Sequence, residues 1–201
     1  MKRNALLITM LIVGLNLTAQ TRFGVKAGLA MGTVTSNDSE VKEDGSALAS
    51  FQFGGIGDTR LTNQLSFQYQ LLLLGKGTAI AHDDHRDKFL FTALDIPLQL
   101  LYRAKQGWFI GGGPNLGFNL SARHIHEGVK EEIAIGDAAG EVKRFDMGLI
   151  ASAGFQSKKG VVLSLNYLKG LSQLQNAPNF DWQNNVIGIS IGYMLAARPK
   201  K

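Results

Sequence analysis

Apolar residues recur at every second position over most of this sequence, and this period of two constrains the fold more than any other feature. In residues 23–32 the odd positions are apolar: Phe23, Val25, Ala27, Leu29 and Met31. The even positions between them are small or polar, and residues 187–195 repeat the pattern. Successive side chains of a β-strand point to opposite faces, so the alternation predicts strands with one apolar face and one small, mostly polar face.

Six further segments alternate in the same way. This gives eight predicted strands: residues 23–32, 47–57, 64–76, 88–103, 108–121, 145–157, 161–171 and 187–195. At about 10–14 residues, they are long for a soluble sheet and close to the roughly 9–11 residues that a tilted membrane strand needs.

The connections between these strands alternate in length. The short ones are residues 58–63, 104–107 and 158–160, and the longer, polar ones are residues 35–46, 77–87, 122–144 and 172–183. Short periplasmic turns and long extracellular loops are typical of outer-membrane barrels, and an even strand number places both termini in the periplasm. We therefore predict an all-β chain, an eight-stranded antiparallel transmembrane β-barrel with up-and-down topology.

The first nineteen residues have the pattern of a secretory signal peptide. Lys2 and Arg3 precede an apolar core at residues 5–17, and small residues ending at Ala19 offer a cleavage site before Gln20. The alternative, an uncleaved anchor helix, would need about 20 apolar residues. We expect a signal peptide at 1–19, a barrel domain at 20–195 and a short basic periplasmic tail at 196–201, in the outer membrane of a Gram-negative bacterium.

Charge and composition favour a membrane barrel over other classes. Without Lys2 and Arg3 the net charge falls from +5 to +3, and no basic patch typical of nucleic-acid binding is present. The chain has no cysteine, so its core or a membrane must stabilise it. The non-apolar face consists mainly of Gly, Ser, Ala, Asn and Gln, which fit the inside of a narrow barrel. A soluble barrel of the lipocalin type, the structural alternative, would carry many charges on its outer face.

Aromatic residues on the apolar face lie close to several predicted strand ends. They are Tyr69, Tyr102, Trp108, Tyr167 and Tyr193. Amphipathic rings are enriched where a membrane meets water, so we expect these five residues at the membrane interfaces. Strand propensity alone would also favour Tyr and Trp, but it would not explain their placement. The expected partners are outer-membrane lipid and lipopolysaccharide, together with an envelope or extracellular protein.

Charged residues fall on the predicted lumen face. They are Lys26, Asp95, Arg103, Arg144 and Asp146. Charges inside a narrow barrel must pair, because an unpaired buried ion is costly. The favoured interpretation is a polar network that plugs the barrel, and the alternative is a narrow ion path. We further predict that Lys26 and Asp95 share one network, with Arg103 as a third member.

All four histidines of the sequence fall in two predicted extracellular loops. The metal-ligand candidates are His82, Asp83, Asp84, His85, His124 and His126. Imidazole and carboxylate groups suit Zn, Ni or Cu, although His and Asp are also common in solvated loops. The glycine run at 111–113 lacks the Lys-Ser/Thr of a phosphate-binding loop. No catalytic arrangement is evident, so we expect a protein that is not an enzyme and has no cofactor.

Several short segments also resemble a known family. They are FGVKAG at 23–28, LDIPL at 94–98, GGGPNLG at 111–117, NYLKGL at 166–171 and ISIGY at 189–193. In their order and spacing they resemble Bacteroidetes-type outer-membrane β-barrel proteins, a porin-type family that includes PorT-like barrels tied to protein secretion. Such barrels usually end on an aromatic residue, whereas this chain continues past Tyr193 into residues 196–201.

The expected function follows from the barrel and the family together. The leading expectation is a structural or interaction role through the extracellular loops, chiefly residues 122–144. The alternatives are a porin-like channel for small solutes or ions, and a barrel component of a protein-secretion assembly. A fold shared by many small barrels does not by itself choose among these roles.

Overall fold

The computed structural model describes residues 21–36, 45–81, 86–126, 129–175 and 182–195. The predicted signal peptide at 1–19, the tail at 196–201 and the loop residues His82, Asp83, Asp84 and His85 lie outside the described residues. The described part forms nine strands: β1 (Thr21–Thr35), β2 (Gly45–Arg60), β3 (Leu65–Ala81), β4 (Arg86–Arg103), β5 (Trp108–His126), β6 (Val129–Ile133), β7 (Phe145–Gln156), β8 (Val161–Gly170) and β9 (Gln183–Met194). Among the described residues, no helix is long and apolar enough to cross a membrane.

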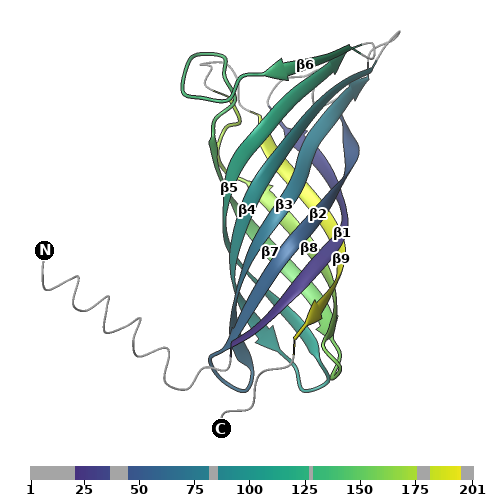
Figure 1. The fold of residues 1–201 in the computed structure, drawn as a ribbon, viewed down its shortest axis with the longest axis vertical. Helices are drawn as coiled ribbons and strands as arrows, with labels where there is room; N and C mark the ends of the chain where they lie inside the picture. Colours follow the sequence, from purple (N-terminus) through teal and green to yellow (C-terminus); the bar gives the residue numbers. More distant parts are fainter. Residues whose placement is uncertain (1–20, 37–44, 82–85, 127–128, 176–181, 196–201) are drawn as a thin grey trace, which may run out of the picture.

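Eight of these strands close into a barrel (Figure 1). Each pairs antiparallel with the next along the chain, in the order β1-β2-β3-β4-β5-β7-β8-β9, and β9 pairs with β1 to close the sheet. The ninth strand, β6, pairs only with the end of β5. The predicted eight-stranded, up-and-down antiparallel barrel is therefore confirmed. We call its two ends the short-turn end, where β4 turns into β5, and the long-loop end, where β6 lies.

The strands continue past the predicted boundaries at the long-loop end. Residues 77–87 were expected to form a loop, but β3 runs to Ala81 and β4 begins at Arg86. Similarly, β5 continues to His126, and β6 lies within the expected loop at 122–144. An apolar outer face is needed only within a membrane, and beyond it the ladder can continue with polar side chains facing water. The alternation that located the strands therefore underestimated their length.

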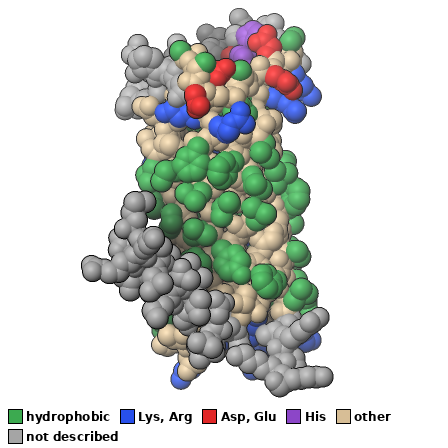
Figure 2. All heavy atoms as spheres, turned by 60° about the vertical axis from the view of Figure 1, so that its left-hand side comes forward, with side chains coloured by type: hydrophobic (Ala, Val, Ile, Leu, Met, Phe, Trp, Pro, Cys, Tyr) green, Lys and Arg blue, Asp and Glu red, His purple; other side chains and the backbone are tan. Residues whose placement is uncertain are grey.

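The barrel exposes apolar side chains on its outside and buries polar side chains inside, the opposite of a soluble protein. Apolar side chains of alternate positions point outward, with Leu29 70% exposed and Ile189 64% exposed. Figure 2 shows these side chains as a broad apolar belt, with the charged side chains gathered mainly beyond it at the long-loop end. The inward positions hold buried Lys, Asp, Gln, Asn and Ser side chains. An exposed apolar belt over a polar interior fits a lipid environment and excludes the soluble barrel that was the structural alternative.

Buried polar and apolar side chains succeed one another along the inward face of β4. From the long-loop end its buried inward residues include Phe91, Asp95, Gln99, Leu101 and Arg103. Leu101 belongs to an apolar cluster towards the short-turn end, and Phe91 belongs to another at the long-loop end. The core of this barrel is therefore a stack of packed side chains inside the sheet.

Candidate functional site

The lumen contains a buried ion triad. Lys76 on β3 places its Nζ 2.9 Å from Oδ1 of Asp95 on β4 and 3.0 Å from Oδ2 of Asp146 on β7. The Nδ2 group of Asn115 donates to Oδ2 of Asp95 at 2.8 Å, and the Ser172 hydroxyl donates to Oδ1 of Asp146 at 2.6 Å. Since β7 borders neither β3 nor β4 in the sheet, the triad links side chains across the lumen.

A second ionic group lies near the short-turn end. Arg103 at the end of β4 forms a salt bridge through Nη2 with Asp58 on β2. Its Nε donates to the Ser66 hydroxyl at 2.8 Å, and its Nη1 donates to Oε1 of Gln156 at 2.7 Å. All three nitrogen atoms of the guanidinium therefore donate to a partner, which stabilises a charged group at a buried position.

The predicted pairing of Lys26 with Asp95 is wrong. The buried Nζ of Lys26 donates to Oε1 of Gln70 at 3.3 Å, and Gln70 donates to Gln68, which reaches Asp58. Asp95 instead pairs with Lys76. Lys26 thus joins the group around Arg103, and the cross-lumen partners differ from the expectation because the stagger of a closed sheet determines which side chains meet.

The placement of Arg144 is also wrong. Its side chain is exposed and donates to the carbonyl of Ile135 at 3.3 Å, in the connection that precedes β7. Sequence reasoning missed Lys76, the last residue of the predicted strand at 64–76, and Asp58, the first residue after the predicted strand at 47–57. Both have the even numbering of their inward neighbours Gln70 and Gln52 on the same strands, so strand alternation, carried further, would have placed them in the lumen.

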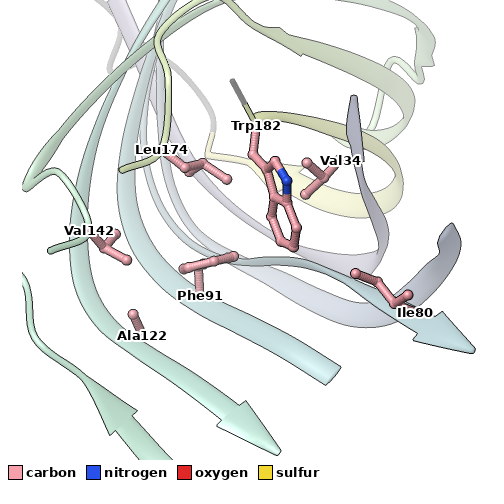
Figure 3. Close-up of a cluster of buried hydrophobic side chains, with 7 residues drawn as sticks. All are labelled: Val34, Ile80, Phe91, Ala122, Val142, Leu174 and Trp182. Carbon is pink, nitrogen blue, oxygen red and sulfur yellow. The ribbon is translucent and has the colours of Figure 1, made fainter. Parts of the chain in front are cut away.

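The long-loop end is closed by an apolar cap. Its members are Val34, Ile80, Phe91, Ala122, Val142, Leu174 and Trp182, which point toward one another in Figure 3. Four come from barrel strands, and Val142, Leu174 and Trp182 come from the connections that follow β6 and β8. Backbone bonds hold these connections in place, from Lys143 N to Leu174 O at 2.8 Å and from Leu174 N to Trp182 O at 2.9 Å. The cap is therefore an ordered part of the fold.

Between the cap and the short-turn end little empty space remains. The cavity lined by Gln52, Asp95, Asn115 and neighbouring apolar side chains has a volume of about 20 Å³, on the order of one water molecule. The charged residues buried in the described part of the chain are three cations and three anions: Lys26, Lys76, Arg103, Asp58, Asp95 and Asp146. The interior is thus filled and electrically balanced.

The short-turn end opens into a basic cavity of about 340 Å³. Its lining includes Arg22, Arg60, Lys105 and Lys158, and the Arg103 side chain also contributes to it. The salt bridge between Arg103 and Asp58 lies beside this cavity and separates it from the polar groups deeper in the lumen. The cavity is therefore a mouth of the barrel.

A polar cluster lies at the rim of the long-loop end. His124 and His126 on β5 approach Asp87 on β4, with distances to Asp87 Oδ1 of 3.5 Å from Nε2 of His124 and 2.7 Å from Nδ1 of His126. The His124 ring stacks on Phe89 with 4.4 Å between ring centroids, and Phe89 packs edge-on against Trp182 of the cap. Two of the six metal-ligand candidates are thereby brought together, with Asp87 as a third group that sequence reasoning missed.

The five predicted interface aromatics all lie on outward positions. Tyr102, Trp108, Tyr167 and Tyr193 are exposed, and Tyr69 is partly exposed. Tyr102, Trp108 and Tyr193 lie within two residues of strand ends at the short-turn end, and Tyr167 lies nearer the other end of β8. Their location at the two membrane interfaces stays a prediction.

A comparison with protein families matches residues 18–176 to the outer membrane protein beta-barrel domain. The chain belongs to this family. The match covers β1 to β8, and the structure extends the barrel to β9. Membership in the outer membrane protein beta-barrel domain family places the chain in the bacterial outer membrane. Because short periplasmic turns and long extracellular loops are typical of such barrels, we expect the short-turn end to face the periplasm.

Two solved outer-membrane barrels share this fold. One is Ail, the attachment invasion locus protein of Yersinia pestis, with 14% identity, a TM-score of 0.51, and coverage of 88% of this chain and 99% of Ail. The other is Neisserial surface protein A, with 13% identity, a TM-score of 0.56, and coverage of 85% of this chain and 96% of that protein. At these identities the likeness concerns the fold alone. None of the curated proteins compared with the chain matches it.

Proposed function

We propose that this family member is a closed, non-enzymatic barrel that presents its extracellular end for interaction. The observation that carries the proposal is the filled lumen, with the apolar cap above the Lys76 triad and the Arg103 group below it. The lumen side chains that could do acid–base chemistry bond to one another, and a cavity of about 20 Å³ leaves no room for a substrate.

The extracellular end supplies the surface for such an interaction. The strands β3 to β5 have 17 to 19 residues, against the roughly 9–11 that span a membrane, so they project beyond the lipid. The short strand β6 adds an exposed apolar side chain, Val129, and exposed charges at Lys130, Glu131 and Glu132. Partners of this surface are lipopolysaccharide of the same membrane or a protein outside the cell.

The test of closure is conductance. The protein, folded in detergent and verified by its heat-modifiable gel mobility, is inserted into planar bilayers. We expect no steady single-channel current, even at a large molar excess over a porin control that conducts. Reproducible steps from the wild-type barrel would overturn the proposal and favour the porin-like alternative.

A second candidate is a barrel component of a protein-secretion assembly. The sequence segments that resemble Bacteroidetes-type and PorT-like barrels favour it, among them LDIPL at 94–98 on β4. Cross-linking in native membranes through a cysteine placed at Lys105, in a periplasmic turn, tests this role. A stable adduct with another envelope protein would support it, and only lipid or self adducts would count against it.

We also propose that residues 1–19 are removed on export. Lys2, Arg3 and the apolar core at 5–17 support this, as does a barrel that begins at Thr21. Intact mass measurement of the membrane-extracted protein should give a chain that starts at Gln20. A mass that includes Met1 would instead favour the alternative, an uncleaved N-terminal anchor helix.

A further inference from the structure

We propose that Asp87, His124 and His126 form a binding site for one divalent transition-metal ion, of the class Zn²⁺, Ni²⁺ or Cu²⁺, on the inner side of the extracellular rim. The site is independent of whether the lumen conducts. The three residues each offer one ligand atom, and these atoms all lie within 4.8 Å of one another.

The register of β4 and β5 creates this cluster. Phe89 pairs with His124 and Lys88 pairs with Ile125, so Asp87 lies across from His126 as the ladder continues. His124 and His126 are two residues apart on one strand and therefore share a face. Asp87 shares the parity of Phe89 on β4, so all three side chains belong to the same face of the hairpin.

An extra residue in β5 turns that face inward. Thr92 pairs with Ser121 and Ala93 pairs with Asn119, which leaves Leu120 unpaired in a bulge. Below the bulge the odd positions of β5 are buried, as at Asn119, whereas above it the even position Ala122 is buried in the cap. The same shift directs His124 and His126 to the inner side of the rim.

The cap orients one of the ligands before any ion binds. The His124 ring is nearly parallel to Phe89, with 5° between their planes, and Phe89 is held by Trp182. The Nε2 atom of His124 is buried and faces Oδ1 of Asp87 at 3.5 Å, and within the described part of the chain it makes no hydrogen bond. A ligand ring held by packing loses little conformational freedom on binding. In the tautomer protonated at Nδ1, the Nε2 atom can offer its lone pair to an ion.

The donor set indicates the class of ion. Two imidazoles and one carboxylate suit Zn²⁺, Ni²⁺ and Cu²⁺, whereas Mg²⁺ and Ca²⁺ prefer sets of oxygen atoms. Ligand atoms bind Zn²⁺ at about 2.0–2.2 Å, so two of them can be up to about 4 Å apart. Modest side-chain rotations would bring the three atoms to this spacing. Three protein ligands leave at least one position for water or a donor outside the barrel.

The test uses the folded full chain, purified without a histidine tag. Titration with Co²⁺ as a spectroscopic probe, and with Zn²⁺ by calorimetry, should show one ion per chain and visible d–d absorption bands. His126→Ala and Asp87→Asn should each weaken Zn²⁺ binding by more than the roughly 10–100-fold that loss of a supporting residue costs. His124→Phe should do the same, because phenylalanine retains the stacking on Phe89 and removes the ligand atom.

Two controls keep the result interpretable. Asp137→Asn alters an exposed carboxylate in the connection after β6 and should bind the ion as the wild type does. Heat-modifiable mobility of every variant shows that the barrel has folded. The proposal is overturned if His124→Phe and His126→Ala bind Zn²⁺ as tightly as the wild type, or if only replacement of His82 and His85 abolishes binding.

Discussion

Lys76 places its ammonium group between two carboxylates in the interior of the barrel. The side chain is inaccessible to solvent, and its contacts to Asp95 and Asp146 are its ion pairs. Removing one partner of such a group leaves the other charges buried without compensation. The effect of a substitution here therefore depends on which charge is removed.

Lys76→Met is expected to lower the free energy of unfolding by about 3–5 kcal/mol, because it leaves two carboxylates adjacent in the lumen. Urea unfolding in detergent micelles, followed by tryptophan fluorescence, measures this change. The matched control is Lys26→Met, which removes a buried cation whose contact is the Gln70 amide and should cost much less. Equal losses in the two variants would contradict the assignment of Lys76 as the central cation.

Gly117 leaves the space that the triad occupies. A Cβ atom there would lie 3.0 Å from Oδ1 of Asp95 and 3.2 Å from Nζ of Lys76. Gly117→Val should therefore destabilise the barrel by about 1–3 kcal/mol through overpacking. Gly55→Val is the control, because a Cβ atom at this position meets nothing within 4 Å. The urea midpoints of unfolding of the two variants measure this difference. A midpoint for Gly117→Val equal to that of the wild type would show that the triad tolerates displacement.

At the residue scale the sequence predicts the direction of a side chain better than its partner. Strand alternation directs Lys26, Asp95 and Asp146 inward, and the structure buries all three. It could not identify Lys76 as the partner of Asp95, because that contact depends on the stagger of the closed sheet. Arg144 was misplaced because it lies just before β7, where alternation does not yet apply.

At the scale of elements, the described parts of the connections after β6 and β8 are more ordered than their polar composition indicates. Val142 forms a bridge with Ile135 in its own connection and another with Gln175 in the connection after β8, so the two connections are joined. Three of their apolar residues, Val142, Leu174 and Trp182, enter the cap. A sequence pattern with a period of two cannot reveal such contacts, because they come from residues outside the strands.

Trp182→Ala should open the cap while the barrel stays folded. Truncation of a buried Trp costs roughly 3–5 kcal/mol, and here the loss falls on the connections packed against Trp182. Amide hydrogen exchange of residues 134–144 should become faster in this variant. Trp108→Ala, at an exposed outer position, is the matched control and should leave that exchange unchanged. Unaltered exchange in Trp182→Ala would mean that the loops are held by other contacts.

For the whole molecule, the alternating strands and the lengths of their connections predicted the architecture correctly. The period of two arises because one face of each strand contacts lipid, and this holds for every strand around the barrel. The strand ends and the ninth strand were not predicted, because strands beyond the lipid need no apolar outer face. For the same reason β6, in which four of the five residues are exposed, shows no alternation that would have predicted a membrane strand.

The absence of cysteine allows a direct test of orientation. Glu131→Cys on β6 should react with a membrane-impermeant maleimide in intact cells, because its side chain is exposed at the long-loop end, which we expect to face outward. Lys105→Cys, in the turn between β4 and β5, should react only after the outer membrane is permeabilised. Labelling of Lys105→Cys in intact cells would show that the short-turn end faces outward instead.

The positions of the lumen ion pairs have a consequence for how the barrel is assembled. The three salt bridges described in the lumen join β3 to β4, β3 to β7 and β4 to β2, and none crosses the junction of β1 with β9. That junction is a continuous backbone ladder in which Gly24 pairs with Met194 and Thr35 with Gln183. A curled but open sheet can therefore neutralise these charges first. The final pairing of β1 with β9 then closes the barrel without forming a new ion pair within the bilayer.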